Sequence, residues 1–431
     1  MIVEVEHQRQ GVDLIKIDND ETKIIFTNYG ARVVSWKYHD NNIVLGNVVE
    51  ADEFYHSNPF KFGASIGRYS GRIDNAKFKL KGKEYQLEKN NGEHHLHGGC
   101  HGLDNKLFDY EIRNEIAQIK VIFKTVLKSA DDHFPGDIDV TITHIYDADH
   151  QWSIEYEAVA SEDTLFSPTN HVYFNLNRDN NVVDNHRISS NQLDMYVLDE
   201  RNIVTGDILD LHEVFEDNKI KLSDIFTSQH AQLSQQMTRF GGLDHPFTVG
   251  EHKMYVENHE FMLEVDTDMP HVVFFTFNQP DEWDSPFNIY KPHSGFTLET
   301  QFLPNDINLY GEKAPSILKA GEALIEVSEI REPCWKIQAK YNIPDLVKRM
   351  STSGKTGFYF RVLKQGYVSP NDQLYLIQEA PIEHRLSVQQ LNDLYYNDRQ
   401  NQDMLRYALN NPFLSPTRRD KLQKMYNRTL K

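Results

Sequence analysis

Residues Pro292–Pro304 read PHSGFTLETQFLP, and this stretch places one carboxylate, Glu299, inside an otherwise uncharged run. Its alternation predicts a strand whose successive side chains point to opposite faces. One face would carry Phe296, Leu298 and Thr300, and the other Thr297, Glu299 and Gln301. A Glu among apolar neighbours has a raised pKa and suits proton transfer near neutral pH. The alternative interpretation is a solvent-facing Glu on an edge strand, so the rest of the chain has to decide.

The composition limits the possible classes of protein. The chain has 431 residues, which favours two structural units. Hydrophobic residues make up 39% and aromatic residues 11%, enough for a sizeable core and typical of β-rich or sugar-handling proteins. The formal net charge of −19 repels phosphate backbones and argues against nucleic acid as a partner.

Features of targeting and redox chemistry point to the cytoplasm. No apolar run has the length of a membrane span, so no membrane partner is expected. The first residues, MIVEVEHQRQ, do not resemble a signal peptide. Cys100 and Cys334 are far apart in the sequence, which argues against a disulfide framework. The sequence therefore predicts a reduced, cytoplasmic protein and leaves its oligomeric state open.

Short alternating segments recur through the first three quarters of the chain and predict a mainly β fold. They are Leu14–Trp36, Phe78–Leu87, Val121–Leu127, Asp139–Tyr146 and Trp152–Ala160. Many short strands with few helical patterns indicate a large antiparallel β-sandwich rather than alternating strands and helices.

The pattern changes after about Pro344, where helices are expected. Ser387–Tyr396 begins with a Ser N-cap, and Gln390 completes a capping-box pattern. Gln402–Leu409 is rich in helix formers, and Ser415 with Pro416 predicts the start of a last helix that ends near Leu430. The sequence thus predicts three helices at the C-terminus.

Two glycine-containing stretches gather polar side chains. Gly63–Ile73 reads GASIGRYSGRI and offers Arg68 and Arg72 as planar donors, but it lacks the GK[ST] ending of a phosphate loop. His94–Gly102 reads HHLHGGCHG and holds four histidines. A metal site is one interpretation, yet no CxxC or HExxH spacing accompanies them, and no metal is expected.

Two further stretches carry candidate residues with ordinary alternatives. Thr169–Leu176, TNHVYFNL, surrounds His171 with uncharged residues, and a lone His there is commonly structural. Gly241–Phe247, GGLDHPF, predicts a turn that carries Asp244.

Taken together, these stretches resemble the aldose 1-epimerase (galactose mutarotase) family over roughly Asn19 to Ala320. Five separated motifs occur in the family's order: NYGA at Asn28, GRYSGRI at Gly67, LHGG at Leu96, TNHVYFNL at Thr169 and HSGFTLETQFLPNDIN at His293. The resemblance implies a large antiparallel β-supersandwich that binds a sugar in a cleft across one face.

The same resemblance implies roles for five residues. Glu299 matches the family's catalytic base and His171 its catalytic acid. Arg72 and His97 match residues that hold the sugar near its ring oxygen and anomeric hydroxyl, and Asp244 matches a sugar-hydroxyl ligand. The implied activity interconverts α and β anomers by opening and reclosing the ring, with no cofactor.

Three departures from the family pattern bear on the substrate. Gly71 stands where the family often has Asn, Phe108 where it often has Trp, and Val273 where galactose mutarotases often have a sugar-contacting Gln. Lost contacts relax the choice of sugar. Two alternatives therefore remain, a sugar-binding protein without catalysis and a phosphosugar epimerase with extra cations in its cleft.

The tail resembles a different family. REPCWKI at Arg331 and SGKTGFYFRVLKQGYV at Ser353, followed by three short helices, resemble the end of a MOSC domain and the appended domain of YiiM-like proteins. Cys334 matches the family's characteristic cysteine, which implies a possible link to the molybdenum cofactor. The alternative is a buried small hydrophobe. Because the front half of a MOSC barrel is missing, we expect the tail to have no independent activity.

The expected organisation is therefore a fusion of two parts. Residues 1–322 form the epimerase-like domain, 323–380 a partial MOSC-like segment and 381–431 a three-helix domain. The strand Ala323–Val327 is expected to complete the sheet of the sugar domain.

Overall fold

The structure is a computed structural model of the whole chain. It describes residues 1–46, 60–178, 182–249, 253–279, 290–310, 317–320, 323–330, 337–338, 343–353, 356, 358–364, 374–378, 386–411 and 414–430. The chain forms two compact units, Met1–Leu309 and Tyr310–Lys431, here called the N-terminal and the C-terminal unit. No helix of the described ranges is both long and apolar enough to cross a membrane.

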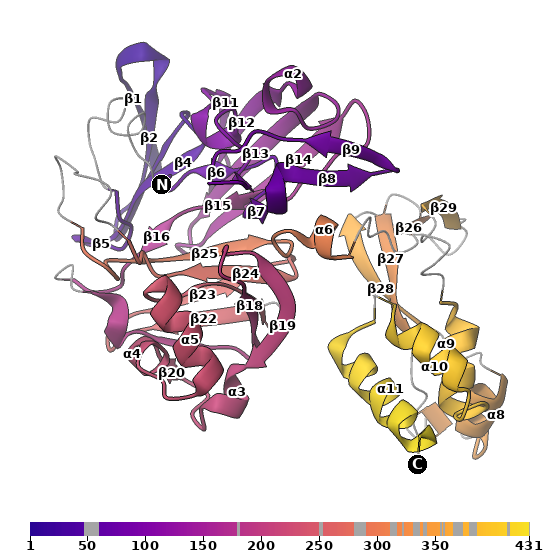
Figure 1. Cartoon of the computed structure of the whole chain (residues 1–431). Coiled ribbons are helices and arrows are strands. Elements are labelled where there is room, and N and C mark those ends of the chain that lie inside the picture. Colours follow the sequence, from indigo (N-terminus) through magenta and orange to yellow (C-terminus); the bar gives the residue numbers. More distant parts are fainter. Residues whose placement is uncertain are drawn as a thin grey trace. The chain divides into compact units, whose positions relative to one another are not determined.

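The N-terminal unit is built mainly from β-strands, coloured indigo to orange in Figure 1. One five-stranded sheet has the order β1 (Ile2–His7), β2 (Asp13–Asn19), β3 (Thr22–Thr27), β4 (Arg32–Tyr38) and β5 (Asn41–Asn42). A four-stranded sheet follows in the order β11 (Asp109–Asn114), β12 (Gln118–Leu127), β13 (Ile138–Asp147) and β14 (Trp152–Ala160). The expected strands in these regions are confirmed, and the segment Leu14–Trp36 contains parts of three strands, β2, β3 and β4.

A six-stranded sheet carries two of the candidate residues, Glu299 and Asp244. Its order is β16 (Tyr173–Phe174), β25 (Phe296–Gln301), β24 (His271–Phe275), β21 (Asp244–Val249), β18 (Leu193–Leu198) and β19 (Val204–Asp210). Another sheet has the order β20 (Ile220–Lys221), β17 (Arg187–Ser189), β22 (Lys253–Glu257) and β23 (Met262–Asp266). The strand of Glu299, β25, therefore lies inside its sheet and not at an edge.

Short strand pairs and helices complete this unit. The pairs are β6 (Ser65–Ile66) with β15 (Thr169–Asn170), β7 (Arg72–Ile73) with β10 (His95–Leu96), and β8 (Lys77–Leu80) with β9 (Lys83–Gln86). The helices are α2 (Ser129–Asp132), α3 (Leu211–Val214), α4 (Leu222–Phe226), α5 (Ala231–Phe240) and α6 (Asp306–Tyr310). Short 3-10 helices are η1 (Arg9–Gly11), η2 (Asp74–Ala76), η3 (Leu103–Asn105) and η4 (Val183–Asn185).

One hydrophobic core joins the sheets of the N-terminal unit. On β13 the alternate residues Ile138, Val140 and Ile142 are buried, as the period of a strand with one covered face requires. They belong to the same cluster as Phe26 of β3 and Phe296 of β25. Every pairing between the named strands is antiparallel in the described part of the chain, which confirms the expected architecture.

The C-terminal unit has a small sheet and helices, as the sequence predicts. The sheet order is β28 (Phe358–Lys364), β27 (Ala323–Ile330), β26 (Ile317–Ala320) and β29 (Leu374–Gln378). The helices are α8 (Leu346–Ser353), α9 (Val388–Tyr396), α10 (Gln402–Leu409) and α11 (Pro416–Thr429). The predicted capping box is confirmed. The Ser387 hydroxyl accepts a hydrogen bond from Gln390 N–H, and Gln390 Oε1 accepts one from Ser387 N–H.

The expectation that Ala323–Val327 completes the sugar domain's sheet is wrong. These residues belong to β27, whose two edges pair with β26 and with β28. A strand has only two hydrogen-bonding edges, so none is left for another sheet. The hairpin partner β26 lies next to β27 in the sequence, and closing such a short loop costs little entropy.

Candidate active site

Glu299 occupies a buried position on β25. Its side chain is 3% exposed, so the interpretation as a solvent-facing edge residue is excluded. Thr297 Oγ1 lies 3.0 Å from Glu299 Oε1 and donates a hydrogen bond to it. Gln301 follows on the same face of the strand, and both Glu299 and Gln301 line one cavity. The alternation in the sequence thus correctly predicted that Glu299 and Gln301 share one face of the strand.

The strands beside β25 supply the floor of this cavity. Register places Val273 of β24 opposite Glu299, and Pro246 of β21 opposite Val273. Two residues earlier along β25, on the same face, Phe275 lies between Thr297 and Asp244. Asp244 begins β21 rather than lying in the predicted turn, which is confined to the glycines before it.

His171 reaches the site from the connection between β15 and β16. Its backbone is fixed on both sides, because His171 N–H donates to the Ala64 carbonyl at 2.8 Å and the His171 carbonyl accepts from Gly63 N–H at 2.9 Å. The imidazole is buried, and its Nε2 lies 3.3 Å from Glu299 Oε1. His171 is therefore a member of the site and not an isolated structural histidine.

His97 lies next to His171 with its tautomer defined by the backbone. Gly71 N–H donates to His97 Nδ1 at 3.2 Å, so Nδ1 is an acceptor and Nε2 is the nitrogen able to carry a proton. The two imidazole rings are 5.3 Å apart between centroids, at 88°. The following Gly98 has φ of 82°, and a Cβ there would lie 2.0 Å from the Gly67 carbonyl oxygen, so glycine is required for this approach.

Arg72, in the glycine-containing stretch Gly63–Ile73, forms an ion pair with Asp244. Arg72 Nη1 lies 3.5 Å from Asp244 Oδ2, and Arg72 Nε donates to Asn91 Oδ1 at 3.0 Å. These two contacts orient the guanidinium across the cavity. Burial raises the pKa of Asp244, and the nearby Arg72 charge opposes that rise.

Burial shifts the two facing titratable groups in opposite directions. Loss of solvation raises the pKa of Glu299 to about 8 and lowers the pKa of His171 to about 3, because each environment disfavours the charged form. Between these values the pair carries one proton. A site that holds one proton between a carboxyl and an imidazole is suited to moving it across a substrate.

The histidine-rich stretch does not act as one cluster. His95 Nδ1 contacts the Glu88 carbonyl, and His94 Nδ1 lies 3.2 Å from Asp74, so of these two neither joins the cavity lining. Donor atoms of His97, His171 and Glu299 do lie within 4.8 Å of one another, close enough to hold a cation. The absence of a metal stays a prediction.

The cavity has a volume of about 250 Å³, and all five predicted site residues of the N-terminal unit line it. Sequence reasoning assigned no role to several polar members of the lining, among them Lys61, Gln301, Asn202 and Asn305. Gln301 was detectable from the strand face that it shares with Glu299. Lys61 gave no such signal, because it is far from Glu299 in the sequence and only the folded chain brings the two residues to one cavity.

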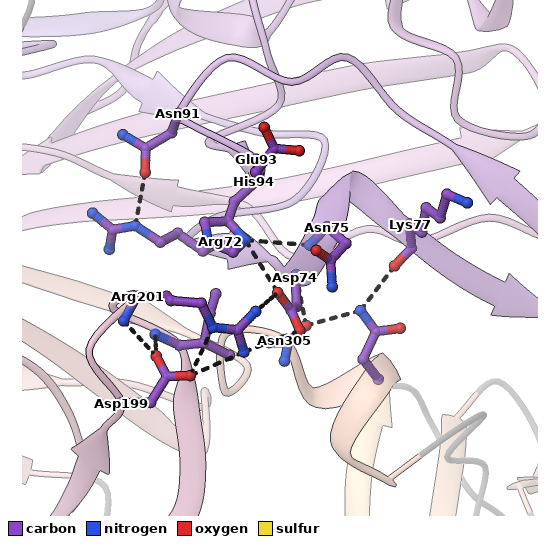
Figure 2. Close-up of polar contacts among 12 residues, drawn as sticks. Arg72, Asp74, Asn75, Lys77, Asn91, Glu93, His94, Asp199, Arg201 and Asn305 are labelled. Atoms are coloured by element: carbon purple, nitrogen blue, oxygen red, sulfur yellow. Dashed lines mark hydrogen bonds and ion pairs between the residues drawn. The ribbon is translucent and has the colours of Figure 1, made fainter.

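A polar network lies beside the cavity and joins three separate segments (Figure 2). Arg201, in the loop between β18 and β19, pairs with Asp199 of its own loop and with Asp74 of η2, at 2.9 Å in each case. Asp74 N–H donates to Asn305 Oδ1 at 2.9 Å. Because Asn202 of the same loop and Asn305 line the cavity, this network ties together parts of its wall.

The three departures have different structural consequences. Phe108 is buried and packs near Phe123, so it belongs to the core and not to the cavity lining. Gly71 and Val273 line the cavity. Gly71 has φ of 75°, and a Cβ there would lie 2.7 Å from Pro304, so this loop has the close packing that glycine permits.

Cys334 lies outside the described residues.

Comparison with known proteins matches three domain families to the chain. The family model for aldose 1-epimerase matches residues 13–330. The MOSC domain model matches residues 300–375, and the model for the YiiM-like 3-alpha helix domain matches residues 386–425. The chain thus has the epimerase part followed by MOSC and three-helix parts, with an overlap that includes β27.

Individual relatives cover most of the N-terminal part. Galactose mutarotase of Sus scrofa is 29% identical over 329 residues, which are 72% of this chain and 91% of that protein. Aldose 1-epimerase of Haemophilus influenzae is 31% identical over 310 residues, 68% of this chain and 88% of that protein. The solved structure of galactose 1-epimerase from Lactobacillus acidophilus has a TM-score of 0.63 at 22% identity, covers 72% of this chain and 92% of its own, and shows the same fold.

Proposed function

Because this chain belongs to the aldose 1-epimerase family, we propose that Glu299 and His171 interconvert the α and β anomers of an aldose as its acid–base pair. The observation that carries this proposal is the 3.3 Å contact between Glu299 Oε1 and His171 Nε2 in a buried cavity. A cyclic hemiacetal opens when its C1 hydroxyl loses a proton and its ring oxygen gains one.

The single proton of the pair is sufficient for this reaction. Glu299, ionised once its proton has moved to His171, takes the C1 hydroxyl proton, and protonated His171 gives its proton to the ring oxygen. The C1–O5 bond breaks and C1 becomes an aldehyde. After rotation about C1–C2, the O5 hydroxyl attacks the other face of C1 while the two groups exchange roles. The total number of protons and electrons is unchanged.

The remaining three residues would position the sugar. Arg72, with its planar donors, and His97, through Nε2, face the same cavity as the pair. Asp244 offers a carboxylate oxygen held near Arg72. These groups suit ring-oxygen and hydroxyl contacts, since a carboxylate accepts and a guanidinium donates.

Polarimetry of a freshly dissolved aldose tests the proposal. We expect Glu299→Gln to reduce the catalysed rate by on the order of 10² to 10⁴, because a general base is lost. The matched control is Thr300→Val, which changes the opposite face of the same strand. Equal catalysed rates for wild type and Glu299→Gln would overturn the proposed base.

The charges in the cavity favour a neutral sugar over a sugar phosphate. The two cations among the described lining residues are each paired, Lys61 with Asp104 and Arg72 with Asp244. A phosphate would have to displace a carboxylate from one of them. A clear preference for a phosphorylated aldose would favour the phosphosugar alternative, and millimolar binding without rate enhancement would favour a sugar-binding protein.

For the tail we propose no independent activity. The match to the MOSC domain covers residues 300–375 and part of it overlaps the epimerase match. Metal analysis of the purified full chain provides the test, since molybdenum cofactor retained by wild type and lost in Cys334→Ser would contradict this proposal. The cytoplasmic location likewise stays a prediction from the sequence.

A further inference from the structure

Gln301 has an unusual position for a polar side chain. It ends β25 two residues after Glu299, is 0% exposed and lines the sugar cavity. Neither its Nε2 nor its Oε1 has a hydrogen-bond partner among the described residues. A buried carboxamide with neither end paired is rare in folded proteins and calls for an explanation.

A second buried glutamine shows how the same fold satisfies a structural carboxamide. Gln236 of α5 is 2% exposed. Its Oε1 accepts from Leu198 N–H at 3.0 Å, and its Nε2 donates to the Leu198 carbonyl at 3.1 Å. Gln236 Oε1 also lies 2.9 Å from His245 Nε2. Gln301 makes no such hydrogen bond to any described residue, so structural support is not its evident role.

No neighbour of Gln301 among the described residues of the sheet forms a hydrogen bond with its amide, and the residue lines the cavity. Its cross-strand partner is His271, whose Nε2 lies 3.3 Å from the Tyr196 hydroxyl. Val273, two residues along β24 on the same face, has an apolar side chain that offers no hydrogen bond. A ligand with hydroxyl groups could satisfy both ends of the carboxamide, because a hydroxyl both donates and accepts.

We propose that Gln301 binds hydroxyl groups of the aldose remote from C1 and thereby selects the sugar. This inference rests on the proposed function for the position of C1 at Glu299. Residues i and i+2 of a strand lie roughly 6.6 to 6.8 Å apart on one face, so Gln301 meets a different part of the ring from Glu299. Nε2 donates to one hydroxyl, and Oε1 accepts from the same or a neighbouring one. A sugar that lacks this hydroxyl leaves the carboxamide unpaired and is rejected.

Deoxy sugars test the proposal in the full-length protein. The measurements are kcat/KM for mutarotation and the sugar-induced rise in Tm, with glucose, galactose and their 3-, 4- and 6-deoxy analogues. For wild type we expect at least one analogue to lose on the order of 10- to 100-fold in kcat/KM. Gln301→Met keeps the length of the side chain without polar atoms, and we expect it to abolish most of that discrimination at one ring position only.

Two controls separate selection from structural support. Thr300→Val, on the other face of β25, should keep the wild-type pattern of discrimination. Without sugar, Gln301→Met should have a Tm equal to or above that of wild type, because an apolar group replaces a buried unpaired amide. The same discrimination in wild type and Gln301→Met, or a large fall in Tm with unchanged discrimination, would overturn the proposal.

The wild-type protein alone gives an independent answer if the variant fails to fold. If none of the 3-, 4- and 6-deoxy analogues binds more than about threefold more weakly than its parent, as judged by the Tm shift, Gln301 does not select a hydroxyl. Absence of mutarotation by wild type, with discrimination kept in the Tm shifts, would reject the catalytic proposal and support Gln301 as a ligand of the sugar.

Discussion

Glu299 Oε1 and His171 Nε2 face one another at 3.3 Å, with both side chains almost completely buried. The carboxyl comes from the middle of a sheet, and the imidazole comes from a connection that is fixed by Ala64 and Gly63. Because the two groups are in contact, their titrations are coupled, and pKa values measured for the site belong to the pair.

The pH dependence of mutarotation follows from this pair. Burial raises the pKa of Glu299 to about 8, so the free site loses its one proton as pH rises through that value. We expect kcat/KM of wild type to fall there. In His171→Asn the remaining activity needs only ionised Glu299 and should instead rise with pH. Polarimetry between pH 5 and 9 measures both curves, and identical curves would contradict the assigned roles.

Glu299→Gln should stabilise the protein at high pH. The pKa of Glu299 is higher in the folded than in the unfolded protein. Below the ordinary glutamate pKa the carboxyl is neutral in both states and its titration does not affect stability. As pH rises from that value to about 8, the unfolded state loses the proton first, and wild type becomes less stable. Gln does not titrate. The gain in free energy of unfolding should therefore grow between pH 5 and 8, up to roughly 4 kcal/mol. Urea unfolding at both values checks this, and equal gains at the two pH values would argue against a raised pKa.

Replacing Arg72 should move the pH profile. The Arg72 charge lowers the pKa of both Asp244 and Glu299, against the larger effect of burial. Arg72→Met should therefore shift the basic limb of kcat/KM to higher pH and raise KM. Arg72→Lys keeps the charge but loses the planar fork, so we expect a smaller shift with a similar rise in KM. A limb that moves to lower pH in Arg72→Met would contradict this account.

His293 should make stability depend on pH. Burial would lower its pKa, but the contacts of Nδ1 with Asp184 Oδ1 and of Nε2 with the Gly241 carbonyl, each at 2.8 Å, raise it overall. A raised pKa gives stability that is fully present below the ordinary histidine pKa of about 6.5 and lost as pH rises through the folded value.

The comparison of His293→Gln with wild type tests this contribution. The variant should be less stable than wild type at pH 5, and this pH-dependent part of the difference should shrink as pH rises through the raised folded pKa of His293. Urea unfolding across this range measures it, with Asp184→Asn as a companion that removes the main charge partner. A difference that grows toward pH 8 would have the wrong sign.

Truncation tests the independence of the N-terminal unit. Because β27 pairs only with strands of the C-terminal unit in the described part of the chain, a protein that ends at Leu309 should retain mutarotation close to that of full length. A chain that ends at Leu303 is the control, since it lacks Asn305 and its bond to Asp74. Loss of folding in both would indicate that the unit needs residues after Leu309.

The sequence by itself determined the elements and the chemistry of single positions. Alternation fixed the faces of β25, because side chains of a strand alternate whatever surrounds it, and capping residues marked α9 and α11. The quoted stretches and their resemblance to the aldose 1-epimerase family pointed to Glu299, His171, Arg72, His97 and Asp244, and all five line the cavity. Local sequence patterns predict strand faces and helix ends because both depend on the backbone geometry of neighbouring residues.

Only the tertiary structure decided how these residues meet. The register of β25 with β24 places apolar Val273 opposite Glu299, and the fixed turn at His171 sets its 3.3 Å contact. Burial then raised one pKa and lowered the other, an effect of the surrounding volume that no motif encodes. The choice of β27 between two sheets was likewise a competition between strand edges, and only the folded chain shows that the buried amide of Gln301 has no hydrogen-bond partner among the described residues.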